Sequence, residues 1–504
     1  MDVSHQRAPL RPDLRLTIAS DLLRLARSED ELLLANAGHL DPLYIRRGGR
    51  YIRAFLEAAA GLGSVALVTE TFPHERRLLE TLVAHRILIP ADASGRGAPA
   101  GCVGPLAENG LPPQERISLY LLLAQSCNMG CIYCLNGRET YQTARRLRMP
   151  AEIARQSIQR FLDNVRPGGT LEVVFFGGEP LLNWPLAKDL ILYCEGTLKA
   201  KEPGKKFHYH FTTNLSLLPP DAPEWAKRYG ITFLCDVDGP PPIHDRCRPF
   251  AHGGGTHATI AHHIRQLTAA GIPVDLRATV TARNHEHLPA TARHHQELGA
   301  RSSAFVPVNP VNSDEDMLPE DLLPSPDAMM AGMTELFRRR TWPATALHPF
   351  NIYAERLGPG CRAEVGCGMP YGQTIVVDAN GDLYPCIYLV GIRRFALGNV
   401  KEPASADPPV LRQMRETLHV DRLAECRACQ LRYLCGGGCP LWRLTVAGNP
   451  QASPRTLAYC QRVGCEYTRK MIELLLWDAG EQSAARVLGR QATEKPAGAA
   501  LARC

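Results

Sequence analysis

The chain has 504 residues, enough for about three domains, and its 45% apolar content is sufficient for buried cores. Its net charge of +6 is mild for this length, which gives no case for a nucleic-acid partner and does not oppose an acidic peptide. The N-terminus lacks the apolar core of a signal peptide, and no apolar run approaches the roughly 20 residues of a membrane span, so we expect a cytoplasmic protein without a membrane partner.

The first block of the chain, residues 14–95, is expected to form a separate domain. Its order of elements is similar to that of a small winged-helix domain, which can act as a packing module or bind nucleic acid, since fold does not fix function. Residues 96–115, rich in Gly, Pro and Ala, are the expected linker. The predicted elements are strands at 32–35 and 43–45, helices at 51–60 and 75–86, and a closing strand at 87–90.

Residues 116–310 alternate between strand and helix patterns in six units. They predict an α/β fold with a partial (β/α)6 barrel of the TIM type, whose ligands collect at the carboxyl ends of the parallel strands. Glycines at 230, 271 and 299 stand where helices should stop. Two histidine pairs, at 262–263 and 294–295, are expected on exposed helix faces. The predicted strands begin near Ile117, Leu171, Lys206, Ile231, Pro273 and Arg301.

The 17 cysteines are odd in number and mostly clustered, which favours reduced metal ligands over disulfides. Cys127, Cys131 and Cys134 have the spacing CxxxCxxC and directly follow the first predicted barrel strand. A 4Fe-4S cluster needs four ligands, so three thiolates leave one iron open to bind and activate a substrate. Zinc is the alternative, but it requires a fourth close ligand and usually a CxxC pair on each side.

A glycine-rich turn follows the second predicted barrel strand. It consists of Gly177, Gly178, Glu179 and Pro180, and its paired glycines let the backbone approach a ligand without a Cβ in the way. Such a sequence on its own is more often a turn than a site. Its place one helical segment after the three-cysteine loop, at the same end of the barrel, predicts that the two share a ligand.

The CxxxCxxC loop and the GGEP turn together resemble the two signatures of radical S-adenosylmethionine (SAM) enzymes. The resemblance implies that Cys127, Cys131 and Cys134 are catalytic and hold a 4Fe-4S cluster. In that family the open iron chelates SAM, and an electron from the cluster releases a 5'-deoxyadenosyl radical. The resemblance also implies that the GGEP backbone and Glu179 hold the SAM amino group.

Two further segments resemble motifs of the same family at the ends of the third and fourth strands. Asn214 ends the sequence Thr-Thr-Asn after the third strand, Asp236 ends the fourth strand, and Arg248 follows shortly. The resemblance implies that these three residues line the ribose and carboxylate of SAM. Asp236 departs from the usual Ser: it can still accept hydrogen bonds from ribose hydroxyls, but its charge would lie near the SAM carboxylate.

Residues 311–355 are expected to bridge to a third domain at 356–478, followed by a mobile tail at 479–504. The third domain resembles the SPASM extension of peptide-modifying radical SAM enzymes, which holds two auxiliary 4Fe-4S clusters and brings the expected total to three. A zinc ribbon is the alternative, but it would leave four of the eight cysteines idle. We assign the nearer cluster to Cys361, Cys367, Cys386 and Cys439, and the outer one to Cys426, Cys429, Cys435 and Cys460, with Cys465 as the alternative to Cys460.

The resemblance as a whole implies an oxidoreductase-type maturase of a ribosomally made precursor peptide, with a flavodoxin or ferredoxin-type reductant. The N-terminal block is similar to the leader-recognition domain that precedes many such enzymes. Similarity of residues 119–134 to thioether-forming maturases favours a crosslink from Cys sulfur to carbon. The alternatives are carbon-carbon or carbon-oxygen crosslinking, a sulfatase-type formylglycine maturase, and an iron-sulfur or zinc protein without catalysis. Ile387 disfavours the formylglycine maturase, because that family carries an Asp base at this place.

Overall fold

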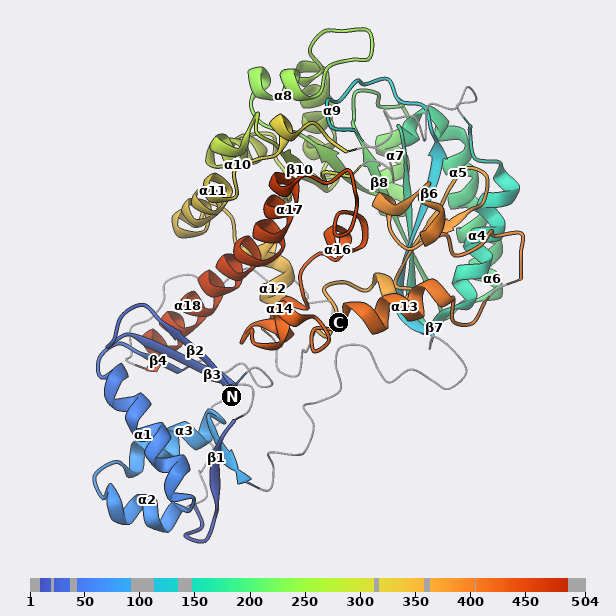
Figure 1. Ribbon diagram of the computed structural model, residues 1–504. Helices are drawn as coiled ribbons and strands as arrows, with labels where there is room; N and C mark the ends of the chain where they lie inside the picture. The colour runs from blue at the N-terminus through green and yellow to red at the C-terminus, as the bar shows by residue number, and fades with distance from the viewer. Residues whose placement is uncertain are drawn as a thin grey trace.

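The computed structural model describes residues 10–19, 22–36, 43–91, 113–134, 147–311, 317–357, 363–403 and 405–487. They form a small N-terminal domain, a central unit built on a nine-stranded sheet, and a cysteine-rich C-terminal segment (Figure 1). Figure 1 shows the N-terminal domain in blue, away from the central unit and at the end of a long C-terminal helix in red. The predicted linker lies almost entirely outside the described residues.

The N-terminal domain contains two small antiparallel sheets and three helices. The predicted elements are confirmed, but the first two strands and the middle helix are additional to the prediction. The second strand has the sequence LLRLA, whose residues favour a helix at least as much as a strand. One sheet pairs β1 (Leu16–Ile18) with β5 (Leu88–Pro90), the other joins β2 (Leu22–Ala26), β3 (Leu32–Asn36) and β4 (Leu43–Ile45), and the helices are α1 (Gly49–Leu62), α2 (Val65–Thr71) and α3 (Arg76–Ala84).

The central sheet confirms the predicted partial barrel. Its first six strands are parallel, and each lies beside its successor in the chain. The first two begin earlier than predicted, because Gln114 already pairs with Val165 ahead of the apolar runs. The six strands are β6 (Gln114–Ala124), β7 (Val165–Gly177), β8 (Lys206–Thr213), β9 (Thr232–Asp236), β10 (Val274–Val280) and β11 (Ser302–Pro307).

Helices connect these strands and cover the outside of the sheet (Figure 1). The first of them buries Ile153, Ile158 and Phe161 against it, at the spacing of one helix face. Gly230, in the left-handed region, ends α7 as predicted. The connecting helices are α4 (Ala151–Asp163), α5 (Trp184–Leu192), α6 (Lys199–Lys201), α7 (Ala222–Tyr229), α8 (Pro241–Cys247), α9 (His257–Ala269) and α10 (Leu288–Glu297).

Both edges of the six-stranded core are covered by strands from later in the chain. β12 (Leu347–His348) pairs with β11, and β13 (Thr374–Val377) pairs in parallel with β6. β14 (Leu383–Tyr384) then pairs with β13 in the antiparallel sense. The sheet therefore crosses the boundary predicted at residue 310, and later strands pair with part of each edge of its six-stranded core.

The C-terminal segment is made of short helices joined by turns that carry the cysteines. Gly436 has a φ of +66°, and a Cβ there would lie 2.7 Å from the carbonyl oxygen of Val365, so only glycine lets the chain pass at this point. None of the described helices is long and apolar enough to cross a membrane. The helices are α11 (Pro326–Arg339), α12 (Phe350–Arg356), α13 (Pro409–Leu418), α14 (Ala424–Arg427), α15 (Arg432–Cys435), α16 (Leu441–Thr445), α17 (Pro454–Gln461) and α18 (Thr468–Val487).

The last helix, α18, contacts the N-terminal domain. Leu33 of β3 packs against its apolar face, on the side of the sheet opposite the domain's own helices. The rings of Tyr44 and Trp477 meet edge to face at 5.7 Å, and the Arg27 guanidinium lies 4.3 Å from the centre of the Trp477 ring. α18 continues to residue 487, inside the range predicted as a mobile tail, and residues 488–504 lie outside the described residues. The mobility of the tail stays a prediction.

Candidate active site

A cavity lies at the carboxyl ends of the barrel strands, where the sequence predicts ligand binding. Its walls come from the loop after β6, the turn after β7, and polar residues at the ends of β8, β9 and β10. The structure thus brings together segments that are more than a hundred residues apart in the chain. Of the predicted site residues, those that line the cavity are Cys127, Cys131, Cys134, Gly177, Gly178, Asn214, Asp236 and Arg248.

The three cysteines of the loop are half-buried and free. Asn214 Nδ2 lies 3.5 Å from Cys127 Sγ, and Arg248 Nη1 lies 3.7 Å from Cys131 Sγ. Burial raises the pKa of the Cys127 thiol to about 11, so a metal must displace its proton at neutral pH. Three thiols from one loop, beside hydrogen-bond donors and an otherwise polar wall, fit a 4Fe-4S cluster that keeps one iron for another ligand.

The two glycines of the GGEP turn allow the turn to contact the cysteine loop. Gly177 has a φ of +131°, and a Cβ there would collide with the carbonyl oxygen of Ala124. A Cβ at Gly178 would collide with the carbonyl oxygen of Ser126, the residue before Cys127. Both positions therefore require glycine, and the turn is held against the cysteine loop by backbone packing.

The side chain of Glu179 contacts the end of β8 and the loop that follows it. Its carboxylate is fully buried and accepts hydrogen bonds from Leu181 N at 2.9 Å, Thr213 Oγ1 at 2.7 Å and Asn214 N at 2.8 Å. Burial raises its pKa to about 7. The side chain thus fixes the loop that presents Asn214 and, like the buried Pro180, is not among the residues that line the described cavity. A contact of the Glu179 side chain with SAM stays a prediction.

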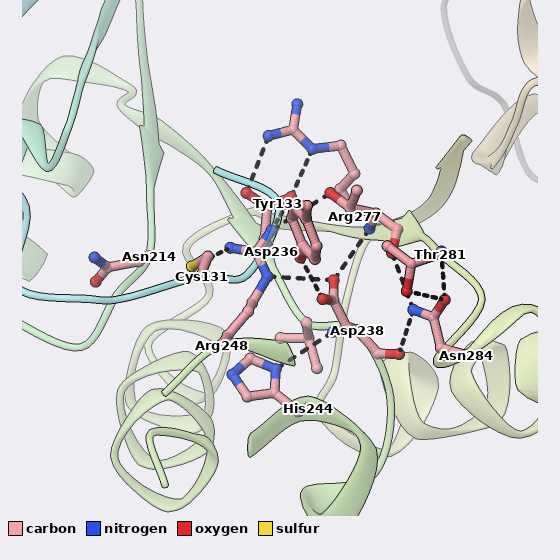
Figure 2. Close-up of polar contacts among 12 residues, drawn as sticks. Cys131, Tyr133, Asn214, Asp236, Asp238, His244, Arg248, Arg277, Thr281 and Asn284 are labelled. Atoms are coloured by element: carbon pink, nitrogen blue, oxygen red, sulfur yellow. Dashed lines mark hydrogen bonds and ion pairs between the residues drawn. The ribbon is translucent and has the colours of Figure 1, made fainter. Parts of the chain in front are cut away.

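Two carboxylates and two guanidinium groups form the charged wall of the cavity (Figure 2). Arg277 donates from Nε to Asp236 Oδ1 at 2.6 Å and from Nη2 to Asp236 Oδ2 at 3.0 Å. Arg248 Nη2 lies 3.4 Å from Asp236 Oδ1, and its Nε lies 3.2 Å from Asp238 Oδ1. Burial acts to raise the pKa of Asp236, but the two arginines outweigh it and lower that pKa to about 2. Asp236 is therefore ionised at neutral pH, where both arginines keep their positive charge.

Sequence reasoning missed three residues of this wall: Tyr133, Asp238 and Arg277. The Tyr133 hydroxyl donates to Asp238, and its ring centre lies 5.3 Å from the Arg248 guanidinium carbon. A signal for Arg277 exists in the sequence of β10, VDLRATV, whose polar residues alternate with fully buried apolar ones. Because side chains alternate across a strand, that pattern places an arginine inside the barrel.

The C-terminal segment closes the cavity with Ile387 and Tyr388, which directly follow Cys386. Burial raises the pKa of Tyr388 to about 12, so its hydroxyl keeps its proton at neutral pH. Tyr388 also lines a second cavity. That cavity is lined by four cysteines of the C-terminal segment, Cys367, Cys435, Cys439 and Cys460.

The C-terminal cysteines form two groups. Within each group, neighbouring thiols raise the pKa values of one another. Burial raises the pKa of Cys435 to about 12, and the nearby thiols of Cys426, Cys429 and Cys465 contribute to the rise. The pKa of Cys386 is raised by burial and by Cys439 and Cys367. The pKa of Cys460 is raised by burial and by Cys439, a member of the other group. Cys465 is thus among the thiols near Cys435, and Cys460 is near Cys439. Which of the two ligates the outer cluster stays a prediction, and Cys361 lies outside the described residues.

No three Cys, His, Asp or Glu side chains in the described part of the chain lie close enough to share a single metal ion. A zinc ribbon needs four ligands within about 2.3 Å of one ion. A 4Fe-4S cluster presents four separate irons to its ligands, and its thiolates stand further apart.

Residues 121–294, which supply most of the cavity, match the model of the radical SAM superfamily. The chain carries a radical SAM domain. It is therefore an enzyme of a kind that uses a 4Fe-4S cluster and SAM, and the three-thiol loop with its polar wall is where these groups fit.

Relatives and solved structures agree with this assignment. The chain is 25% identical over 357 residues to the serine-type anaerobic sulfatase-maturating enzyme of Klebsiella pneumoniae, covering 67% of this chain and 85% of the relative. It is 27% identical over 137 residues to the radical SAM cyclopropyl synthase TigE of Paramaledivibacter caminithermalis, covering 25% of this chain and 28% of that one. The fold matches anSMEcpe with bound AdoMet and the Kp18Cys peptide, with a TM-score of 0.57 at 18% identity over 73% of this chain and 99% of that one.

Proposed function

We propose that this radical SAM enzyme modifies a ribosomally made precursor peptide and forms a thioether crosslink in it. The observation that carries the peptide assignment is the cavity itself: three thiols and a charged wall on one side, and Ile387 and Tyr388 of a cysteine-rich C-terminal segment on the other. A sulfatase-maturating relative and a fold match that holds a peptide support the same substrate class.

The cluster and SAM, when bound, supply a 5'-deoxyadenosyl radical that removes a hydrogen atom from a peptide carbon. The residues of this chain provide the rest of the site. Cys127, Cys131 and Cys134 would hold the cluster, and Asn214 and Arg248 donate to the sulfurs of Cys127 and Cys131. An apolar side of the cavity, available to the peptide, is formed by Leu122, Phe176, Ile387 and Tyr388.

Thioether formation balances if an electron acceptor is present. The carbon loses one hydrogen atom, the Cys thiol loses one proton, the carbon-sulfur bond forms, and one electron remains to be removed. The two C-terminal cysteine groups would hold two auxiliary 4Fe-4S clusters, which makes three clusters in total and supplies the acceptor. The preference for sulfur over a carbon or oxygen partner rests on family resemblance alone.

Formylglycine formation is the second candidate, because a sulfatase-maturating enzyme is among the relatives. Against it, Ile387 lines the cavity at the place where that family carries an Asp base, and an isoleucine cannot take a proton. We therefore expect no formylglycine on a sulfatase-type peptide after reaction with the purified protein. Its appearance would favour the second candidate over the first.

The N-terminal domain, residues 14–95, is proposed to bind the leader of the precursor, by pairing an extended segment with a sheet edge beside α3. The proposed setting is the cytoplasm, with a flavodoxin or ferredoxin-type protein as the electron source. These assignments follow from the proposed chemistry, which needs a reducing environment and a low-potential electron.

Mass spectrometry of the cognate peptide tests the reaction. A thioether requires the loss of two hydrogens and one fewer alkylatable thiol for each crosslink. A product that loses two hydrogens but keeps every thiol would contradict the thioether. Fragmentation would then separate carbon-carbon or carbon-oxygen crosslinking from oxidation of a serine to formylglycine, which also removes two hydrogens.

A further inference from the structure

We propose that Arg277 is a positioning residue for SAM: by neutralising Asp236, it lets the carboxylate of SAM bind at Arg248 beside an aspartate that would otherwise repel it. The inference rests on the proposed function only in that SAM must occupy this cavity.

Asp236 and Arg277 form a bidentate ion pair. They are direct neighbours across β9 and β10 in the parallel register, and two hydrogen bonds of 2.6 and 3.0 Å join them. Their side chains are only 12% and 22% exposed. Water screens such a pair weakly, so the charge of Asp236 would act strongly on its surroundings if Arg277 were absent.

Arg248 is the cation beside the three-thiol loop. Its Nη1 lies 3.7 Å from Cys131 Sγ, and the other side of its guanidinium already faces two carboxylates, Asp236 at 3.4 Å and Asp238 at 3.2 Å. A SAM carboxylate at Arg248 would be the third carboxylate around one cation, and like charges at this range oppose one another. Arg277 supplies the second cation, paired with Asp236.

A purely structural pair would behave differently. If Arg277 only stabilised the barrel, its loss would weaken the binding of every ligand of the cavity alike. The size of the effect would not depend on the charge of the ligand. If Arg277 acts by neutralising Asp236, its loss should weaken the binding of SAM and change the binding of decarboxylated SAM little. Once Asp236 is replaced by an uncharged residue, the loss of Arg277 should also change the binding of SAM little.

The test is a double-mutant cycle on the full-length, anaerobically reconstituted protein, measured as the dissociation constant of SAM by equilibrium dialysis without turnover. Arg277→Met should weaken SAM binding by about tenfold or more, and decarboxylated SAM by less than about threefold. In the Asp236→Ser background, the same change should alter SAM binding by less than about threefold.

Two further variants keep the test interpretable. Arg301→Met is the matched control. Arg301 pairs with Asp275 of β10, the strand that carries Arg277, and its Nε lies 3.0 Å from Asp275 Oδ1. Because Arg301 does not line the cavity, SAM binding should be unchanged in this variant. Arg277→Lys keeps the charge but loses the two-pronged contact, so it should fall between wild type and Arg277→Met, and it serves if the methionine variant does not fold.

Three results would overturn the inference: wild-type affinity in Arg277→Met, an equal loss for SAM and decarboxylated SAM, or an equal loss whether Asp236 is kept or replaced by serine. Failure of the assignment of SAM to this cavity, which is the part of the proposed function that the inference needs, looks different. In that case the wild-type protein itself does not bind SAM.

Discussion

The two cysteine-lined cavities of this enzyme differ in what surrounds their thiols. The cavity at the mouth of the barrel sets three cysteines beside a wall of charged and amide groups. The second cavity sets its cysteines among mainly aromatic and aliphatic side chains, including Trp442, Tyr459 and Tyr467. Groups around a metal site determine what it binds and how far water reaches it. The difference fits the proposal that the first cavity binds a polar ligand on iron and that the second would hold iron away from water.

We expect the largest effect from removal of a thiol of the first cavity, which tests whether that cavity is the one that binds SAM. Cys127→Ala should reduce SAM cleavage to background, because the cluster that binds SAM loses a ligand, while the C-terminal groups keep theirs. 5'-Deoxyadenosine is measured after reconstitution and reduction. Cys194→Ala, a fully buried cysteine in the core of the barrel, is the control and should retain cleavage. Undiminished cleavage by Cys127→Ala would contradict the role given to the loop.

Removing a thiol of the C-terminal segment should leave SAM cleavage intact and reduce crosslinking instead. Cys435→Ala should lose about four of twelve irons and lower the yield of crosslinked peptide by about tenfold or more, while SAM cleavage continues. The reason is that bond formation leaves an electron with no acceptor, whereas SAM cleavage needs only the first cluster. Iron content, 5'-deoxyadenosine and peptide mass are measured on one preparation. If crosslinking is normal without the outer cluster, that cluster is not the required electron acceptor.

Cys465 and Cys460 give a finer version of the same comparison. Cys465→Ser should lose the iron of the outer cluster, because its thiol stands with Cys426, Cys429 and Cys435. Cys460→Ser is the matched variant, from the same helical stretch, and should keep that iron. The reverse order of iron loss would restore the assignment made from the sequence.

Removal of the N-terminal domain should have the smallest effect on chemistry. We expect a protein that lacks residues 1–95 to bind the full-length precursor about tenfold more weakly, and to process a leaderless peptide at about the same rate as the intact enzyme. Binding is measured by fluorescence anisotropy of a labelled precursor. Because the domain covers Trp477 of α18, a thermal melt must first show that the truncated protein is folded. Unchanged affinity would make the domain a packing module.

The barrel could be predicted because strand and helix patterns alternate along the chain and because the first two strands contain apolar runs that end at a motif. The strands at its two edges could not. β13 lies beside β6 although about 250 residues separate them, and a four-residue strand carries no sign of its partner. The N-terminal helices at 51–60 and 75–86 were visible from their periodicity, while leucine-rich β2 was not, because its residues favour a helix as readily as a strand.

Within the site, the motif residues could be predicted and their partners could not. Glu179 belongs to a motif, but its burial and its contacts with the loop of Asn214 depend on the fold. His295 was expected on a helix surface because it is polar. It is fully buried and bonds to Ser303 Oγ at 2.8 Å and the carbonyl oxygen of Val237 at 2.7 Å, partners that only the fold brings near.

The electron paramagnetic resonance spectrum of the reduced protein, recorded with and without SAM, tests the central claim most directly. The proposed function requires one cluster with an iron that is free to bind SAM, and auxiliary clusters that are fully ligated by cysteine. We predict that SAM changes one cluster signal, leaves the others unchanged, and changes none in Cys127→Ala. A spectrum that does not respond to SAM, or a response that survives in Cys127→Ala, would contradict the account.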